Sequence, residues 1–405
     1  MIPSEPINNS IQNKIVDTIS NSTNKIKNAL SNPLVGTFKE NISQYKNVIG
    51  LLVALFIFIL ISYFISENYR INLVLTDMLI YDSVMVVNNS NFKGDYKLAD
   101  YYVASSFRSV VGRNQRFDYC STRLLQKILK NGARFIWLDV FNSDLSEKPK
   151  PVVCNGIGQG NWQLTLNSLT FDECCQTIAE TAFTSGKVNN YNDPIFVALN
   201  LNTQGNLYSL DKIQKSIIKH LGERLLEVHY GFNKVNIGQI PMSKLKNKVV
   251  IFCSNGFQHS SLEELVNYCW DNDDMKKLVY KSIDPNVKVT EYVKENLDAL
   301  KDFNTNNLTI VTPDPNTLFT RQYKPNYAWD AGCQFVSMYY QSVDKMIEQH
   351  VNKFKNKSFV LKPPNLRTQS HQTPNLVAAQ QSINDMKTDE EKNDPIINKC
   401  PLSNL

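Results

Sequence analysis

The chain has 405 residues and a formal net charge of +5, from 43 basic and 38 acidic side chains. This near balance, without a basic cluster along the sequence, argues against a protein that binds nucleic acid. Eight cysteines occur without a CxxC pair, so the sequence indicates neither a zinc site nor a dense disulfide framework. The length suits one large domain and little more.

The first part of the chain, residues 1–46, is polar but carries apolar residues at roughly helical spacing. These residues are Ile11, Ile15, Ile19, Ile26 and Leu30. The pattern is that of an amphipathic helix, which would lie on a membrane surface or pair with another helix. A loosely ordered tail is the alternative interpretation, and both remain open.

Residues 47–66 are predicted to form a single transmembrane helix. The run from Val48 to Phe64 contains no charged side chain. Together with Ile65 it would span roughly 27 Å as a helix, about the thickness of the hydrocarbon core of a bilayer. The long polar segment before it argues against a cleaved signal peptide.

The charges beside this run favour one orientation. Lys39 and Lys46 lie on its N-terminal side, whereas Arg70 is the basic residue nearest its C-terminal side. Because basic residues favour the cytoplasmic side of a membrane, the C-terminal domain is expected on the non-cytoplasmic side.

Residues 67–97 are predicted to be a linker, and residues 369–405, rich in Gln, Asn, Pro and charge, a disordered tail. Between them, in residues 98–368, short apolar runs alternate with helical patterns. Strands are expected at 101–106, 133–141, 151–154, 194–201, 247–254, 308–313 and 333–340, and helices at 122–132, 170–184, 210–226 and 344–354. This alternation predicts an α/β fold, and its length suits one (β/α)8 barrel of the TIM type.

Two blocks of this domain resemble a known enzyme family. Within 98–255, the segments YYVASSFRSVVG, LLQKILKNGARFIWLDVF and KPVVCNG are similar in order and spacing to the X region of the phosphoinositide-specific phospholipases C. Within 276–367, YKPNYAWDAGCQFVSMYYQ and FVLKPPNLR resemble the end of that family's Y region. The resemblance implies a phosphodiesterase barrel of the phospholipase C kind, with its site at the carboxyl ends of the strands.

The resemblance also implies a particular chemistry. In the family, one histidine polarises the phosphoryl oxygen and a second protonates the leaving alkoxide. A calcium ion, held by an Asn, two Glu and an Asp, lowers the pKa of the attacking inositol hydroxyl. Lysines and an arginine further along the chain hold the phosphates of the headgroup.

This chain departs from the family at most of those positions. The family's two histidines, Asn, two glutamates and Asp fall, in that order, on Phe107, Asn155, Arg108, Trp137, Asn200 and Asp139. Only Asp139 keeps the family's residue type, and alone it would be a weak remnant of a metal site. Phe107 and Trp137 are expected to make the floor of the barrel mouth apolar, and Arg108 to pair with a carboxylate such as Asp139.

The headgroup-binding positions are also altered. The strand that carries lysines in the family has Phe252 and Ser254 here, and the arginine position falls on Ile310. Apolar or neutral side chains therefore stand where the family has the residues that hold the headgroup phosphates.

The histidines offer one possible replacement for the missing acid. His259 follows a predicted strand and is the candidate for a place at the barrel mouth. His220 and His350 fall within helical patterns and His371 falls in the tail, so these three are expected to be solvated surface residues.

Two functions follow from this pattern. The first is a membrane-anchored pseudoenzyme whose barrel binds lipid headgroups or a partner protein, without catalysis and without a cofactor. The alternative is a phosphoric diester hydrolase with a rebuilt site that uses Asp139, His259 and Arg108, and calcium is expected only if activity is retained. Membrane lipids are the expected partners, and nucleic acid is not.

The composition suggests a source for such a protein. Its many Asn, Lys and Ile residues are typical of an AT-rich genome and resemble those of phospholipase-like proteins from large DNA viruses. A host or virion membrane is therefore an expected location.

Overall fold

The computed structural model describes residues 20–21, 24, 45–92, 94–158, 161–271, 275–284, 297–315, 317 and 321–368. The predicted N-terminal apolar stripe and the predicted tail, 369–405, lie outside these residues. The chain divides into two compact units, Met1–Asn68 and Tyr69–Leu405, and the second unit contains the predicted barrel.

Helix α3, Lys46–Asp77, contains the predicted membrane segment. The large apolar side chains between Val48 and Ile61 are exposed and do not pack into a protein core. Among the described residues, this is the one helix that is long and apolar enough to cross a membrane.

Eight parallel strands form a nearly closed barrel, in the order β10-β11-β12-β1-β2-β7-β8-β9. They are β1 Tyr101–Ser106, β2 Phe135–Asn142, β7 Ile195–Asn202, β8 Val249–Cys253, β9 Tyr268–Cys269, β10 Met275–Val279, β11 Leu308–Thr312 and β12 Phe335–Met338. Between described residues, no ladder joins β9 to β10. The carboxyl ends of the strands meet at one end of the barrel, here named the mouth.

The remaining strands lie beside the barrel path. β3, Pro151–Val153, runs antiparallel to β2, and β13, Phe359–Leu361, runs antiparallel to β1. β6, Leu169–Thr170, pairs with β3, while β4, Gly156–Ile157, and β5, Trp162–Gln163, form a hairpin. The strand predicted at 151–154 therefore exists, but it lies outside the parallel barrel wall.

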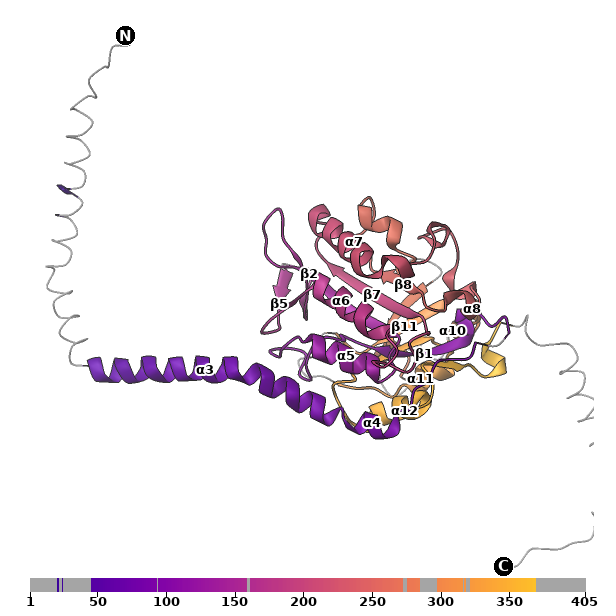
Figure 1. The fold of residues 1–405 in the computed structure, drawn as a ribbon, viewed down its shortest axis with the longest axis horizontal. Helices are drawn as coiled ribbons and strands as arrows, with labels where there is room; N and C mark the ends of the chain where they lie inside the picture. The colour runs from indigo at the N-terminus through magenta and orange to yellow at the C-terminus, as the bar shows by residue number, and fades with distance from the viewer. Residues whose placement is uncertain are drawn as a thin grey trace, which may run out of the picture. The chain divides into compact units, whose positions relative to one another are not determined.

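Helices cover the outside of the barrel (Figure 1). They are α5 Thr122–Lys130, α6 Phe171–Ala182, α7 Leu207–Leu221, α8 Met242–Leu245, α10 Leu297–Asn306, α11 Asn326–Asp330 and α12 Lys345–Phe354. Helices α5, α6 and α7 lie side by side along one part of the wall. Side chains of Ser121, Thr170 and Asp344 accept hydrogen bonds from the first-turn N–H groups of α5, α6 and α12, and these caps fix where the helices begin.

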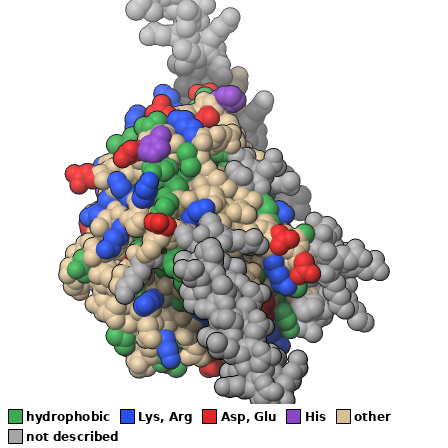
Figure 2. Space-filling view, turned by 90° about the vertical axis from the view of Figure 1, so that its right-hand side faces the viewer, with side chains coloured by type: hydrophobic (Ala, Val, Ile, Leu, Met, Phe, Trp, Pro, Cys, Tyr) green, Lys and Arg blue, Asp and Glu red, His purple; other side chains and the backbone are tan. Residues whose placement is uncertain are grey.

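The outer surface carries both signs of charge. On the face shown in Figure 2, blue basic and red acidic side chains are interspersed among green apolar ones. That face therefore shows no large patch of a single charge.

The barrel interior is filled with aromatic side chains. Alternate residues of a strand point to the same face, so one set from each strand points inward. Phe135, Phe196, Phe252 and Phe335 come from four different strands and are fully buried, with contacting ring centroids 4.9 to 6.1 Å apart. The interior is thus a packed core beneath the mouth.

The observed elements confirm the predicted (β/α)8-type α/β barrel. Each strand and helix expected from the sequence overlaps an observed one, with ends shifted by a few residues. Two strands of the barrel wall, β9 and β10, were not predicted, and neither were helix α10 and the short elements β4, β5, β6, β13, α8, α11 and α4 (Ile80–Val84). β9 has only two residues, and β10 reads MKKLV, in which adjacent lysines hide the alternation of a half-buried strand.

The prediction that residues 67–97 form a linker is wrong for most of that segment. The last part of α3 and the short helix α4, Ile80–Val84, pack against the barrel within the second unit. Their buried side chains are Ile71, Val74, Met78 and Tyr81. The Tyr81 hydroxyl donates a hydrogen bond to the Tyr340 carbonyl (3.0 Å). Ile71, Val74 and Met78 continue the helical spacing of the apolar run that precedes them. In the sequence, this core-facing stripe could therefore not be distinguished from the end of the membrane segment.

His350 was also predicted incorrectly as a surface residue. It is fully buried on α12, its Nε2 lies 2.9 Å from the Tyr340 hydroxyl, and its ring stacks near Trp329. Burial lowers the pKa of His350 to about 3, so the imidazole is neutral in the folded protein at physiological pH. It is a structural residue of the core beside Tyr81.

Replacing Met78 tests whether the segment after the membrane helix belongs to the folded domain. In a fragment of residues 69–405, Met78→Ala should lower the free energy of unfolding by about 2–5 kcal/mol, because it leaves a cavity in a fully buried site. Leu79→Ala, one residue along and 55% exposed, should change it little. Equal effects of the two substitutions in urea denaturation would contradict the packing described here.

Candidate functional site

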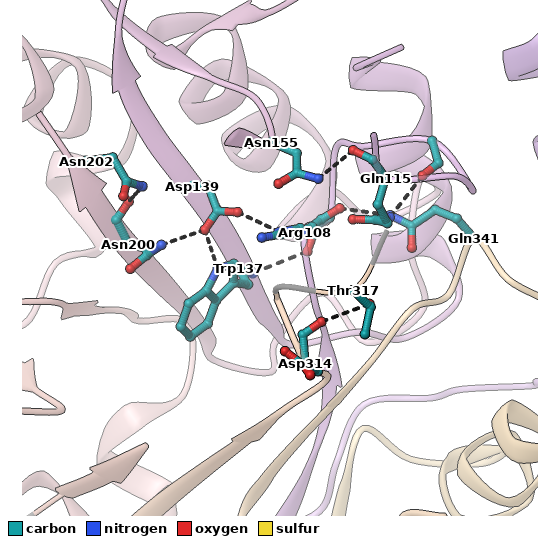
Figure 3. A network of polar contacts seen from close by, with 12 residues as sticks. Arg108, Gln115, Trp137, Asp139, Asn155, Asn200, Asn202, Asp314, Thr317 and Gln341 are labelled. Atoms are coloured by element: carbon teal, nitrogen blue, oxygen red, sulfur yellow. Dashed lines mark hydrogen bonds and ion pairs between the residues drawn. The ribbon is translucent and has the colours of Figure 1, made fainter. Parts of the chain in front are cut away.

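Asp139 is the centre of a polar network at the mouth (Figure 3). One carboxylate oxygen, Oδ2, accepts a hydrogen bond from Nε of Arg108 at 2.7 Å. The other, Oδ1, accepts from the indole Nε1 of Trp137 and from Nδ2 of Asn200, each at 2.8 Å. Both oxygens of the one retained acidic residue are therefore engaged by donors from its own chain.

The barrel geometry brings these residues together. Trp137 and Asp139 are two residues apart on β2, so both side chains point to the interior. Asn200 on β7 is the direct pairing partner of Asp139. Arg108 follows β1, and its positive φ of 47° places the backbone in the left-handed region that residues other than glycine seldom adopt.

Contacts from the segment that follows β12 hold Arg108 in this conformation. The side-chain amide of Gln341 donates a hydrogen bond to the Arg108 carbonyl at 2.9 Å. The guanidinium lies 5.2 Å from the centre of the Phe107 ring and is almost fully buried. The Tyr339 hydroxyl lies beside it, and burial raises the pKa of Tyr339 to about 12, so this hydroxyl is neutral. The Arg108 side chain is thus held in one position in the wall of the barrel mouth.

Phe107 and Trp137 form an apolar floor below this network. Both side chains are at most 2% exposed, and their ring centroids are 5.2 Å apart. Trp137 also stacks on Trp270 at 4.9 Å, and Phe107 contacts Tyr339 at 5.5 Å. The positions expected for the first family histidine and for one glutamate ligand of the metal are therefore occupied by packed rings.

Asn155, at the position of the second family histidine, is also buried. It follows β3, and its side-chain amide donates to the backbone carbonyl of Gln115. The neighbouring Cys154 N–H donates to the Asp139 carbonyl at 3.2 Å, which ties this segment to β2. An amide has no proton to transfer at neutral pH, so Asn155 cannot act as a general acid.

The other predicted positions have contacts of their own, away from Asp139. Phe252 lies in the aromatic core, Ile310 is buried in the interior, and the Ser254 hydroxyl accepts a hydrogen bond from Leu201 N–H at 2.8 Å. His259 is exposed on the loop after β8, and its backbone N–H bonds to Glu263. Within the described part of the chain, no hydrogen bond or ion pair joins His259 to Arg108 or Asp139.

Lys277 is a mouth residue that the sequence analysis did not identify. It lies on β10, and its ammonium is 5.1 Å from the ring centre of Trp137 and 5.6 Å from that of Trp270. Burial by the surrounding walls lowers the pKa of Lys277, and the carboxylates of Asp139 and Asp271 partly oppose that shift. Its only sequence signal is the MKKLV segment, which lacks the apolar alternation that predicts a strand.

The residues at the mouth do not fit a calcium ion. Calcium needs six to eight oxygen ligands, usually from several carboxylates. The Asp139 carboxylate already accepts hydrogen bonds from three donors. The neighbouring Arg108 guanidinium and Lys277 ammonium would also repel a cation. Among the described residues, no cluster of three or more His, Cys, Asp or Glu could hold a metal.

Removing the Asp139 charge tests this network. In the 69–405 fragment, Asp139→Asn should lower the free energy of unfolding by about 3–5 kcal/mol, because it leaves the Arg108 guanidinium buried without its counter-ion. Asp298→Asn is the matched control, since Asp298 is 91% exposed and pairs with Lys301 on the surface, where such pairs contribute little. A destabilisation no larger than that of the control would show that the pair does not hold the mouth together.

Comparisons with known proteins agree with this fold. Family models described as the X domain and the Y domain of phosphatidylinositol-specific phospholipase C match residues 95–254 and 263–365, more than half of the chain. A search of curated protein sequences finds no match.

Solved structures with a similar fold include those of L. pealei and S. officinalis PLC21. Each has a TM-score of 0.54 and 18% sequence identity to this chain, over 70% and 69% of its residues. The matched regions cover 39% and 38% of those chains, so this chain corresponds to about two fifths of their length. By its X and Y domains, the chain belongs to the phosphatidylinositol-specific phospholipase C family.

Proposed function

We propose that this protein is a membrane-anchored, non-catalytic phospholipase C-like barrel that binds lipid headgroups. The observation that carries the proposal is the hydrogen bonding of Asp139 to Arg108, Trp137 and Asn200. A guanidinium and two neutral donors surround the carboxylate that would otherwise contribute to a calcium site, so the mouth is stabilised without a metal.

The missing acid and phosphoryl stabiliser support the same proposal. Each contributes roughly two to four powers of ten to an enzyme's rate. Phe107 and Asn155 occupy the corresponding positions, and neither side chain can donate or accept a proton at neutral pH. Because Phe107 is packed against Trp137 and Tyr339, a substrate could not displace it without opening the core.

A rebuilt hydrolytic site is less well supported. Such a site needs an acid and a base within reach of one phosphate position. Arg108 and Asp139 are bonded to each other, and His259 is exposed on a separate loop with no described contact to them. These three residues do not form one catalytic group.

Apolar side chains on the loops around the mouth support a lipid surface as the partner. Phe117 between β1 and α5, Leu145 between β2 and β3, and Trp162 on the β4–β5 hairpin are 65%, 77% and 67% exposed. Large side chains this exposed at loop tips are typical of membrane or partner contacts when several occur together. Helix α3 would keep the protein at a bilayer, where such loops meet lipid.

A hydrolysis assay tests the proposal directly. The full-length chain, purified in detergent and mixed with phosphatidylinositol micelles, should release no inositol phosphate above a protein-free sample, with or without calcium. An active calcium-dependent phospholipase C on the same micelles serves as the positive control. Calcium-dependent release by this chain that disappears in Asp139→Asn would overturn the proposal.

A further inference from the structure

The two lysines of β10 have opposite environments. Met275 and Lys277 point into the barrel, and the Lys277 ammonium lies over the Trp137 and Trp270 rings. Lys276 lies on the other side of the strand, where its ammonium is 4.1 Å from the ring centre of Phe303 on α10. Adjacent residues of the same type thus provide one interior and one exterior cation.

Lys277 differs from the other cations near the mouth in having no ion-pair partner among the described residues. Arg108 pairs with Asp139, and Lys281, which follows β10, pairs with Asp314, which follows β11. Among the described residues, Lys277 forms no ion pair within 4.0 Å. Its side chain nevertheless remains exposed to solvent, so an ion that enters the mouth can reach it.

The surroundings of Lys277 favour an incoming anion. Aromatic faces attract a cation more weakly than a carboxylate or phosphate does, and they supply no hydrogen-bond acceptor of comparable strength. The walls also exclude part of the water that would solvate the ammonium, which strengthens its attraction to an anion. The carboxylate of Asp271 accepts a hydrogen bond from Asn255 N–H and lies too far away to form an ion pair with Lys277.

We infer that Lys277 is the anion-binding residue of the mouth and that it takes a single phosphate group without a metal ion. This inference rests on the proposed function and identifies the ligand of that site as a headgroup with one phosphodiester. A lysine acts as a point charge toward phosphate, and it requires no second donor in a fixed geometry. The apolar mouth loops and the membrane helix make a phospholipid, rather than a soluble anion, the source of the phosphate.

The altered headgroup positions limit the charge that the mouth can bind. Phe252, Ser254 and Ile310 provide no cation, so additional phosphates on an inositol ring would find no partner there. The site should therefore bind a headgroup with one phosphodiester about as well as one with further phosphates.

The test compares two variants of the full-length chain in detergent with EDTA present. The probes are glycerophosphoinositol, inorganic phosphate and inositol 1,4,5-trisphosphate, each titrated while tryptophan fluorescence is recorded, since Trp137 and Trp270 flank the ammonium. Lys277→Gln should weaken glycerophosphoinositol binding by about tenfold or more, the loss of one charge-assisted hydrogen bond. Lys276→Gln should bind like the wild type, and inositol trisphosphate should bind no more than about threefold tighter than glycerophosphoinositol.

Three results would overturn the inference. The first is that the Lys277→Gln and Lys276→Gln chains bind glycerophosphoinositol with equal affinity. The second is that the wild-type chain binds inorganic phosphate but neither inositol compound. The third is that the wild-type chain binds none of the three probes. The thermal unfolding of Lys277→Gln should match that of the wild type, because the ammonium forms no ion pair with the described part of the chain. The hydrolysis assay separates the two proposals: turnover contradicts the non-catalytic role, whereas failed binding without turnover contradicts the role of Lys277 and leaves the non-catalytic role standing.

Discussion

The buried ion pair between Arg108 and Asp139 determines what the rest of the barrel mouth can do. An isolated guanidinium or carboxylate would be costly at this depth, and their attraction offsets the loss of water only when the remaining hydrogen-bonding capacity is also used. Trp137 and Asn200 use the remaining hydrogen-bonding capacity, because both donate to Oδ1 of Asp139, the oxygen that Arg108 does not contact. Gln341 supports the backbone of Arg108, which lies in a left-handed conformation. Trp137, Asn200 and Gln341 therefore all support the ion pair between Arg108 and Asp139.

The pair also explains why the aromatic floor is stable. A metal site at the mouth would need open space and water beneath the ion, whereas a guanidinium can lie directly on the Phe107 ring. Phe107, Trp137 and Tyr339 fill that space and join the aromatic core formed by Phe135 and its neighbours. The side chains at these positions therefore add packing to the barrel. This coupling between the ion pair and the core supports the proposed binding role.

The sequence predicted the barrel well because its strands are short apolar runs separated by capped helices, and because two motif blocks fix their order. The motif blocks also placed Phe107, Arg108, Trp137, Asp139, Asn155 and Asn200 near one another. Figure 3 shows the last five around the mouth, and the Phe107 ring packs against Trp137. Tertiary packing was harder to predict. The burial of Met78 and His350 depends on surfaces far away in the sequence, and Lys277 lies on a strand with no apolar alternation. The Lys277 side chain points into the barrel because of the register in which β10 pairs with β11.

Terbium(III) luminescence tests whether the mouth binds a metal, because this ion prefers the same oxygen ligands as calcium and emits when a nearby tryptophan is excited. Trp137 and Trp270 lie at the mouth, so an ion bound beside Asp139 would be within range of both. With Arg108 paired to Asp139, titration of the full-length chain should give no saturable emission that calcium displaces and that Asp139→Asn removes. A saturable emission with both of those properties would show that the mouth binds a metal, and it would contradict this account.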